Sequence, residues 1–495
     1  MMRLGTKFLF FAVAAMALPG CAATLEERNF EAQYALIETA LERDIALLAS
    51  DEFGGRRPAS DGEEKTLAFM QSELERAGFV SGTNDPSNPW RAPVPLVTSS
   101  ASAGTVAFQI DGQEVVFSEA EAAALTGSNR ALVEDAALVY VGTAEDGVDA
   151  SDVSGHVAIL EGEPGKSPAR RAQLFEQGAF AVITLVDSES AVANLRQLSS
   201  RERFQLASEV NDNLSVYITR EAMARTVTQW PKYRTTLDVL QGVKSTATVK
   251  LDETARIEAN SNRRDAISHN FIAKLPGTRP GSGAVLLLGH WDHFGECGEI
   301  GDEDRLCNGA ADNASGIAAM IELGRRLAAS GPHDRDIYVL GTTAEEWGLL
   351  GARAFTETPP LPLGDIVAAF NFDTVAIAPR GGAIGFIGEG KTALDPLVLE
   401  AIAQSGREQG SPVLAEQFLQ RQDGWALLQR DVPAVMVSSA FGNEERLTAY
   451  LRGRYHSASD EAEGLELGGA IEDLLLHERL IRKAASTAQF PQSAQ

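Results

Sequence analysis

Residues 284–290 read Ala-Val-Leu-Leu-Leu-Gly-His, an apolar run that ends in a histidine. Short apolar runs of this kind are typical of strands that are buried on both faces of a parallel sheet. Three more follow, at residues 337–340, 366–372 and 432–437, and helical patterns separate them. Strands that alternate with helices predict an α/β fold, with a mostly parallel central sheet flanked by helices.

Side chains that can bind metal ions follow the ends of these strands. His290 lies just past the first strand, and Glu345 and Glu346 come shortly after the second. Asp373 follows the third strand directly, and His456 lies downstream of the fourth. Open α/β sheets build their sites beyond the carboxyl ends of the strands, so we expect these side chains to meet there.

Asp312 is a further candidate, just before a helix expected over residues 315–329. Asp312 or Asn313 could simply cap that helix, but among the other groups we expect Asp312 to be a ligand. Two histidines and three carboxylates suit a pair of zinc ions, and a spare carboxylate can activate the water that they hold. The predicted zinc ligands are His290, Asp312, Glu346, Asp373 and His456, with Glu345 as the spare carboxylate.

The stretch after the first strand, residues 290–293, reads His-Trp-Asp-His. Metal-binding histidines usually donate their second ring nitrogen to a carboxylate or carbonyl, which fixes the orientation of the ring. Asp292 is placed to accept such a hydrogen bond. We therefore expect the Asp292 side chain to orient His290.

The N-terminus has the features of an export signal. Arg3 and Lys7 precede an apolar stretch at residues 8–18, which is too short to span a bilayer. It ends in Leu-Pro-Gly-Cys21, which resembles a bacterial lipoprotein cleavage box. We predict a signal peptide at residues 1–21, lipidation of Cys21 and export to the periplasm or to the outer membrane as a lipoprotein. The alternative is an ordinary secretory signal cut near Ala22-Ala23.

Export bears on the two remaining cysteines, Cys297 and Cys307. They lie ten residues apart in the loop between His290 and Asp312. In an oxidising compartment the two thiols can form a disulfide that stiffens the approach to the metal site. The alternative is that they serve as two extra metal ligands, although the histidine and carboxylate set is already complete.

The composition limits the possible partners. The 495 residues include 69 acidic and 43 basic side chains, which give a formal net charge of −26. Such a surface repels nucleic acid and anionic lipid, so we expect no nucleic-acid partner and membrane contact only through an N-terminal lipid.

The mature chain divides into three stretches by pattern. Residues 26–95 begin with helical periodicity and contain a second helix over residues 62–77. Residues 96–250 hold short strand-like runs between Gly/Asp turns, lack a histidine and carboxylate cluster, and are predicted to be a β-rich accessory domain. Residues 251–490 carry the α/β pattern and the predicted site.

These motifs resemble the co-catalytic dizinc exopeptidases, the family of bacterial leucine-type aminopeptidases and glutamate carboxypeptidase. The matching stretches are residues 289–293 (Gly-His-Trp-Asp-His), 311–316 (Ala-Asp-Asn-Ala-Ser-Gly), 344–346 (Ala-Glu-Glu), 371–373 (Asn-Phe-Asp) and 455–456 (Tyr-His). Residues 51–57 resemble the N-terminal stretch of the family. The middle region resembles a protease-associated domain, a common insertion in this family, so residues 26–95 and 251–490 would form one peptidase domain around it.

The resemblance implies a role for each matching residue. His290 and Asp373 would hold one zinc ion, Glu346 and His456 would hold the other, and Asp312 would bridge the two. Glu345 would be the general base. Tyr455 would help to stabilise the oxyanion, as the matching tyrosine does in the carboxypeptidase branch.

The function implied is that of an exported aminopeptidase that cleaves N-terminal peptide bonds with zinc-activated water. A carboxypeptidase of the glutamate carboxypeptidase type is the alternative, followed by a glutaminyl cyclase or a non-catalytic receptor. Two departures from the family pattern leave the substrate preference open. Thr374 stands where many relatives have methionine, and residues 421–425 (Arg-Gln-Asp-Gly-Trp) replace a segment that often reads Ser-Asp-His.

Overall fold

The computed structural model describes residues 25–144, 147–162, 167–228, 248–298 and 301–491. The predicted signal peptide and Cys21 lie outside the described residues. Within the described residues, no helix is long and apolar enough to cross a membrane.

The main body is built on a sheet that contains all four predicted strands. The order is β16 (Gly385–Ile387), β17 (Ala434–Ser438), β15 (Ile366–Asn371), β11 (Ala284–His290), β14 (Asp336–Thr342) and one end of β10 (Val249–Leu275). The β17, β15, β11 and β14 strands run parallel, whereas β16 and β10 are antiparallel to their neighbours. The predicted α/β fold with a largely parallel central sheet is confirmed.

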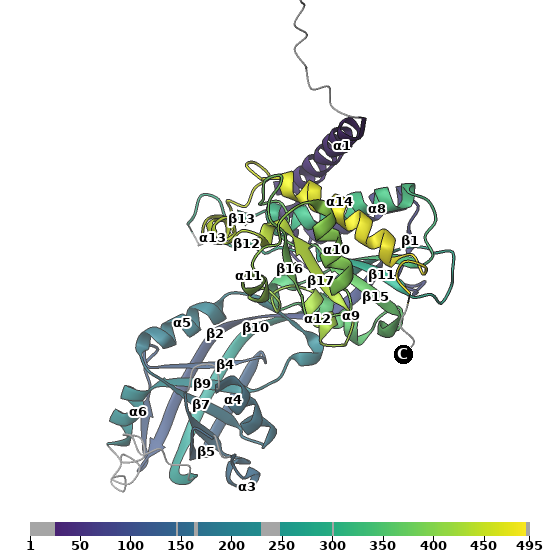
Figure 1. Cartoon of the computed structure of the whole chain (residues 1–495). Coiled ribbons are helices and arrows are strands. Elements are labelled where there is room, and N and C mark those ends of the chain that lie inside the picture. The colour runs from purple at the N-terminus through teal and green to yellow at the C-terminus, as the bar shows by residue number, and fades with distance from the viewer. Residues whose placement is uncertain (1–24, 145–146, 163–166, 229–247, 299–300, 492–495) are drawn as a thin grey trace, which may run out of the picture.

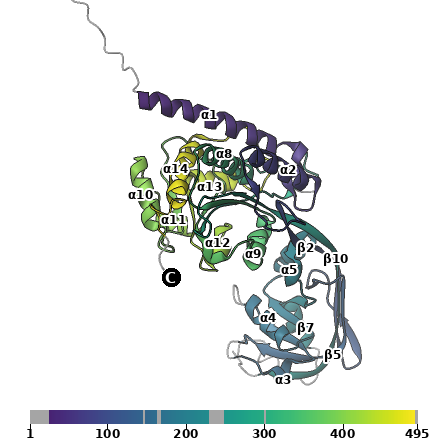
Figure 2. The ribbon, with the colours of Figure 1, turned by 90° about the vertical axis from the view of Figure 1, so that its right-hand side faces the viewer.

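Helices cover both faces of this sheet (Figures 1 and 2). On one face lie α1 (Leu25–Leu48), α2 (Asp61–Arg76), α8 (Ser315–Ala329), α10 (Asp395–Ser405) and α14 (Gly468–Ala484). On the other lie α9 (Leu350–Glu357) and α12 (Gly424–Leu428). The apolar run of β11 is explained by its burial on both faces of the sheet. Val285 and Leu287 pack into the hydrophobic core on one face, and Leu286 packs into the core on the other.

Two long antiparallel strands extend from the main body to a second body. β2 (Arg91–Ile110) pairs with β10 from Phe271↔Arg91 to Thr254↔Gln109. The second body has its own hydrophobic core, which includes Phe108 and Ile159. Its other strands are β3 (Gln113–Val116), β4 (Ala122–Thr126), β5 (Arg130–Gly142), β6 (Val157–Glu161), β7 (Ala181–Val186), β8 (Arg203–Leu206) and β9 (Leu214–Thr219). Its helices are α3 (Ala150–Val153), α4 (Ser167–Glu176), α5 (Glu189–Ser200) and α6 (Arg220–Val227).

The sequence patterns do not predict the length of β2 and β10. The boundaries placed at residues 96 and 250 fall inside these two strands. β10 reads as polar because many of its side chains are only partly buried, and β2 contains Pro93 and Pro95 near its start. Backbone pairing between the two strands, rather than an apolar pattern, defines them.

Shorter elements complete the chain. They are β1 (Val80–Ser81), β12 (Gly295–Glu296), β13 (Leu306–Cys307), α11 (Pro412–Glu416) and α13 (Glu444–Gly453). Single helical turns lie at η1 (Asp51–Arg56), η2 (Ala207–Glu209), η3 (Ala310–Ala314), η4 (Glu345–Trp347), η5 (Leu363–Asp365) and η6 (Ser439–Phe441).

Candidate metal centre

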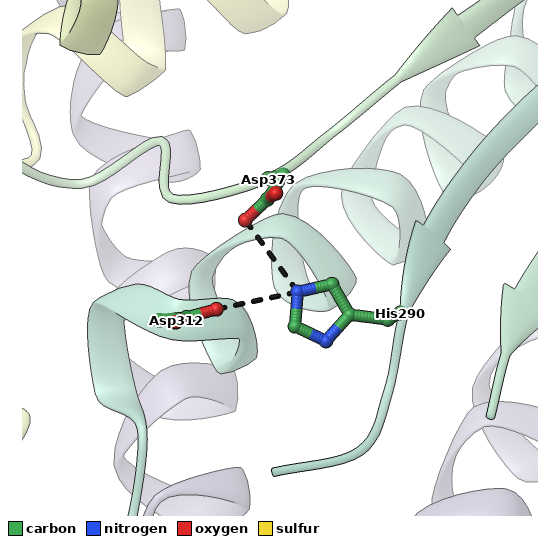
Figure 3. Close-up of side chains that lie close together, drawn as sticks. All are labelled: His290, Asp312 and Asp373. Atoms are coloured by element: carbon green, nitrogen blue, oxygen red, sulfur yellow. Dashed lines mark ion pairs between the residues drawn. The ribbon is translucent and has the colours of Figure 1, made fainter. Parts of the chain in front are cut away.

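The first group of predicted ligands meets at the carboxyl ends of β11 and β15. The imidazole Nε2 of His290 lies 3.2 Å from Oδ1 of Asp312 and 3.5 Å from Oδ1 of Asp373 (Figure 3). The ligand atoms of these three residues all lie within 4.8 Å of one another, which is the spacing that one metal ion requires of its ligands.

A second group lies on the other side of Asp312. Nε2 of His456 is 2.9 Å from Glu346 Oε2 and 3.4 Å from Oδ2 of Asp312. Asp312 therefore directs one carboxylate oxygen to each histidine. The five side chains predicted as ligands are brought together as two groups that share Asp312.

His293 joins the second group and was not predicted as a ligand. It forms an ion pair with Glu346, and the ligand atoms of His293, Asp312 and Glu346 also lie within 4.8 Å of one another. The histidine is fully buried, and neither ring nitrogen has a hydrogen-bond partner. The signal in the sequence was the second histidine of residues 290–293.

Several buried atoms of the two groups face one another at ion-pair distance without a hydrogen bond, which supports a metal at this place. Nε2 of His290, Nε2 of His456 and one carboxylate oxygen of Glu346 are buried and make no hydrogen bond. Buried polar atoms are rarely left without a partner, because the loss of hydration is costly. Imidazole nitrogens and carboxylate oxygens are ordinary ligands of zinc, so the donor set fits that ion.

The turn that carries Asp312 is held by neighbouring polar groups. Asn313 Oδ1 accepts a hydrogen bond from the Gly316 backbone at 3.0 Å, so Asn313 caps α8 and leaves the Asp312 carboxylate free for the histidines. The buried carboxylate of Asp460 accepts bonds from the backbone N–H groups of Ala311 and Asp312.

Glu345 lies beside the two groups without belonging to either. Its Oε2 is 3.9 Å from Nε2 of His290, farther than the carboxylates of Asp312 and Asp373. Burial, together with nearby carboxylates, raises the pKa of Glu345 well above its usual value. A carboxylate that holds a proton readily, close to the ligands but not among them, suits general-base catalysis.

Asp292 differs from its predicted role. Its carboxylate lies 3.9 Å from Nδ1 of His290, whereas the hydrogen bond at this nitrogen, of 3.1 Å, is to the Asp292 main-chain carbonyl. The carboxylate instead accepts a bond from the backbone N–H of Glu345 at 3.1 Å. Asp292 thus connects the turn after β11 to the turn that carries Glu345.

The carboxylates of the centre raise the pKa values of its histidines. Although burial opposes it, Glu345 and the two carboxylates of the first group raise the pKa of His290 well above its usual value. Against the same opposition, Asp312 and Glu346 raise the pKa of His456 to about 9. A protonated histidine would neutralise these carboxylates in the way that a bound cation would.

Tyr455 lies next to the centre. Its ring stacks on the imidazole of His456, with 3.6 Å between the ring centroids, and Arg421 Nη2 lies 3.4 Å from its hydroxyl oxygen. Asp373 and Tyr455 also line a small pocket. The apolar side chains of that pocket are Ile387, Phe418, Met436, Phe441, Leu447 and Leu451.

A larger cleft, of about 1360 Å³, opens on the side of Glu346 and His456. Its walls come from both bodies and include Phe294, Trp347 and residues 197–198 and 200–203 of the second body. Phe204 at the start of β8 packs edge-on against Trp347, with ring centroids 4.8 Å apart. The second body therefore contacts the turn that carries Glu346.

Cys297 and Cys307 form a disulfide bond. The alternative, two extra metal ligands, does not match this arrangement. Cys297 Sγ lies 3.2 Å from the main-chain carbonyl oxygen of His456, so the disulfide packs against the segment that carries one of the predicted ligands.

Comparisons with known proteins bear on this site. Residues 270–474 match the sequence model of Peptidase family M28. A probable lipoprotein aminopeptidase, LpqL, from Mycobacterium tuberculosis (strain ATCC 25618 / H37Rv) is 30% identical over 283 residues, which cover 55% of this chain and 51% of the relative. The chain therefore matches about half the length of that curated relative.

One solved structure has the same fold. The aminopeptidase from Aneurinibacillus sp. strain AM-1 superposes with a TM-score of 0.55 and 18% identity, over 90% of this chain and 94% of that one. A zinc aminopeptidase from Bacillus subtilis has a TM-score of 0.46 and 16% identity, over 91% and 96% of the two chains. The first of these likenesses supports the fold, including the second body.

Proposed function

We propose that this chain, in which residues 270–474 match the model of peptidase family M28, is an exported zinc aminopeptidase that removes residues from the N-termini of peptides. The observation that carries the proposal is the pair of histidine and carboxylate groups that share Asp312, with Glu345 beside them. Export is supported by the signal-like N-terminus and by the relative named as a probable lipoprotein.

Two zinc ions per chain fit the two groups. His290 and Asp373 would hold one ion, Glu346 and His456 the other, and Asp312 would bridge them. His293, whose ring contacts Glu346, is a further candidate for the second position. When bound, zinc would lower the pKa of a water molecule towards neutrality and polarise the scissile carbonyl.

The side chains around these positions would perform the proton transfers. Glu345 would accept the proton of the attacking water and deliver it to the leaving amine, which restores the carboxylate for the next cycle. Its raised pKa favours the first half of this exchange, in which Glu345 takes up the proton. The Tyr455 hydroxyl, beside His456, would donate a hydrogen bond to the oxygen that gains charge in the transition state.

The pocket beside Asp373 supports an N-terminal substrate end. Its apolar walls, which include Met436 and Phe441, suit the side chain of a terminal residue such as leucine, methionine or phenylalanine. The surrounding carboxylates, including Asp373 and the nearby Glu345, favour a free ammonium group over a carboxylate. We therefore propose a preference for apolar N-terminal residues.

One observation favours the second candidate, a carboxypeptidase. Arg421 lines the same pocket and lies within reach of the Tyr455 hydroxyl, so its guanidinium offers a partner for a terminal carboxylate. Arg421→Gln separates the two proposals. It should leave the cleavage of aminoacyl substrates within about threefold of the wild-type rate in an aminopeptidase, and should abolish peptide cleavage in a carboxypeptidase.

We further propose that residues 96–250 act as a protease-associated domain that restricts the cleft to chain ends. The contacts of Phe204 and residues 200–203 with the cleft support this role. The boundaries of such a unit would follow β2 and β10, because both strands cross between the two bodies.

Cleavage of aminoacyl p-nitroanilides by the zinc-loaded protein tests the proposed function. The leucine, methionine and phenylalanine derivatives should be cleaved with higher kcat/KM than the glutamate and lysine derivatives. The Glu345→Gln variant serves as the control for contaminating peptidases. The absence of cleavage with all five substrates would exclude an aminopeptidase of this preference.

A further inference from the structure

Arg56 is a fully buried arginine whose partners are all main-chain carbonyls. Its Nε donates to the carbonyl of Trp291 at 2.9 Å, and Nη2 donates to that of Gly309 at 2.8 Å. Nη1 donates to the carbonyls of Asn308 at 2.6 Å and Leu48 at 2.9 Å. Within the described parts of the chain, Arg56 forms no ion pair, so its role is to bind backbone.

Three of these carbonyls belong to the two loops that carry predicted metal ligands, and the fourth, that of Leu48, lies at the end of α1. Trp291 follows His290 directly, and Gly309 lies three residues before Asp312. The main-chain carbonyl of Arg56 also accepts a bond from the backbone N–H of His293 at 3.3 Å. One residue of the N-terminal segment therefore ties together the turn after β11 and the turn before α8.

The loop at Gly309 packs closely against Asp312 and His293. Gly309 has φ +56°, and a Cβ there would lie 2.6 Å from the ring of His293 and 2.0 Å from the carbonyl oxygen of Asp312. A shift of this loop would therefore displace the ligands as well. Because four bonds from its three nitrogen atoms fix the guanidinium, Arg56 links both loops to one rigid group.

We propose that Arg56 is a positioning residue of the metal centre, which holds His290 and Asp312 at the separation that a bound ion requires. This inference rests on the metal centre of the proposed function. It assigns a role to the N-terminal segment at residues 51–57, which lies far from the ligands in sequence and supplies none of them.

Charge and geometry act in opposite directions on metal affinity at this position. Burial lowers the pKa of Arg56 to about 10, so the group remains charged at neutral pH. Removing a positive charge near carboxylates would by itself strengthen the binding of a cation. Losing the four hydrogen bonds would free the two loops and weaken the binding of the cation. Lysine keeps the charge but not the planar fork, so Arg56→Lys isolates the geometric effect.

Arg335 provides a matched control. It is also almost fully buried and donates to main-chain carbonyls, those of Ser282 at 2.7 Å and Ala484 at 2.6 Å. It precedes β14, whereas the metal centre lies beyond the carboxyl ends of the strands. Substitution of Arg335 should therefore reduce stability to a similar extent without any effect on the ligands.

The test compares Arg56→Lys and Arg56→Gln with Arg335→Lys and Arg335→Gln in the full chain. The Kd for zinc is measured by competition with a chromophoric chelator, and the Tm is measured with and without zinc. All four variants should have a lower Tm than the wild type. Only the Arg56 variants should bind zinc more weakly, by about tenfold or more, and in Arg56→Lys saturating zinc should leave kcat reduced with KM little changed.

Three results would overturn the inference. One is a Kd for Arg56→Lys within twofold of the wild-type value, and another is an equal loss of affinity in Arg335→Lys. The third is tighter zinc binding by Arg56→Gln, which would show that charge outweighs geometry. If Arg56→Gln does not fold, Arg56→Lys decides the outcome. Failure of the wild-type protein to bind zinc in the same assay would reject the proposed function instead.

Discussion

The two carboxylate oxygens of Asp312 face two different histidines. Oδ1 lies 3.2 Å from Nε2 of His290, and Oδ2 lies 3.4 Å from Nε2 of His456. Asp312 is almost fully buried, and the histidines hold its pKa well below the usual value of an aspartate, against the effect of burial. It is the only residue common to both groups of ligands among the described residues. The centre therefore depends on this side chain more than on any other.

Asp312→Ala should lose zinc from both positions. We expect the purified variant to hold less than one zinc ion per chain after dialysis, compared with two in the wild type, as measured by elemental analysis. Asp365→Ala, at an exposed position on the same body, is the control and should keep the wild-type content. Full zinc content in Asp312→Ala would show that the two groups do not share this ligand.

Glu345→Gln should separate catalysis from metal binding. Glutamine has the same shape but cannot accept the proton of the attacking water, so kcat should fall by about 10²- to 10⁴-fold. The zinc content should stay at the wild-type level, since Glu345 lies outside both ligand groups. The neighbouring substitution Glu346→Gln should instead reduce the zinc content. A Glu345→Gln variant with near-normal kcat would reject the general-base role.

The metal-free protein should lose stability as the pH rises. Burial raises the pKa of Asp292 to about 8, and Asp312 and Glu346 raise that of His456 to about 9. A group whose pKa is higher in the folded than in the unfolded state stabilises the folded protein at pH values below its unfolded-state pKa. This stabilisation is lost as the pH rises through the folded-state pKa. Stability is therefore lost between about pH 4 and about pH 8 through Asp292, and between about pH 6.5 and about pH 9 through His456.

Zinc should remove most of this pH dependence, because it takes the place of the histidine proton and compensates the carboxylates. The Tm of the zinc-loaded and metal-free forms can be measured at intervals over the same pH range. The difference between the two should widen as the pH rises. A constant or narrowing difference would contradict the assignment of the raised pKa values to this centre.

The disulfide should stabilise the segment of His456. Cys297→Ser with Cys307→Ser removes a cross-link that closes a loop of ten residues, at a cost in unfolding free energy of about 2–3 kcal/mol. Because Cys297 contacts the His456 carbonyl, zinc should also dissociate faster from this variant. Urea unfolding and zinc release to a chelator measure the two effects. Unchanged zinc release would confine the role of the disulfide to stability.

Much of this site could be predicted because its residues follow strong strand patterns. The runs at β11 and β15 end in His290 and Asp373, and parallel strands bring their carboxyl ends to one edge of the sheet. The pairing of the two cysteines followed from their place in one loop. The predicted use of the Asp292 carboxylate was wrong in detail, because the turn after β11 presents its carbonyl to His290 instead.

Other parts of the site leave no pattern in the sequence. The carbonyl partners of Arg56 lie as far as 253 residues away along the chain, and any residue type can supply a main-chain carbonyl. His293 lies in the site because the turn after β11 brings its ring to Glu346. Hydrophobic periodicity in the sequence does not predict the shape of this turn. The long strand β10 is polar and partly exposed, and β2 has prolines near its start, so only their pairing defines the two strands.

The most direct test of the account is mass spectrometry of a short neutral peptide with an N-terminal leucine, incubated with the zinc-loaded protein beside its N-acetylated twin. We predict stepwise loss of residues from the free N-terminus and no cleavage of the acetylated peptide. Loss of residues from the C-terminus of both peptides would contradict an aminopeptidase and establish a carboxypeptidase.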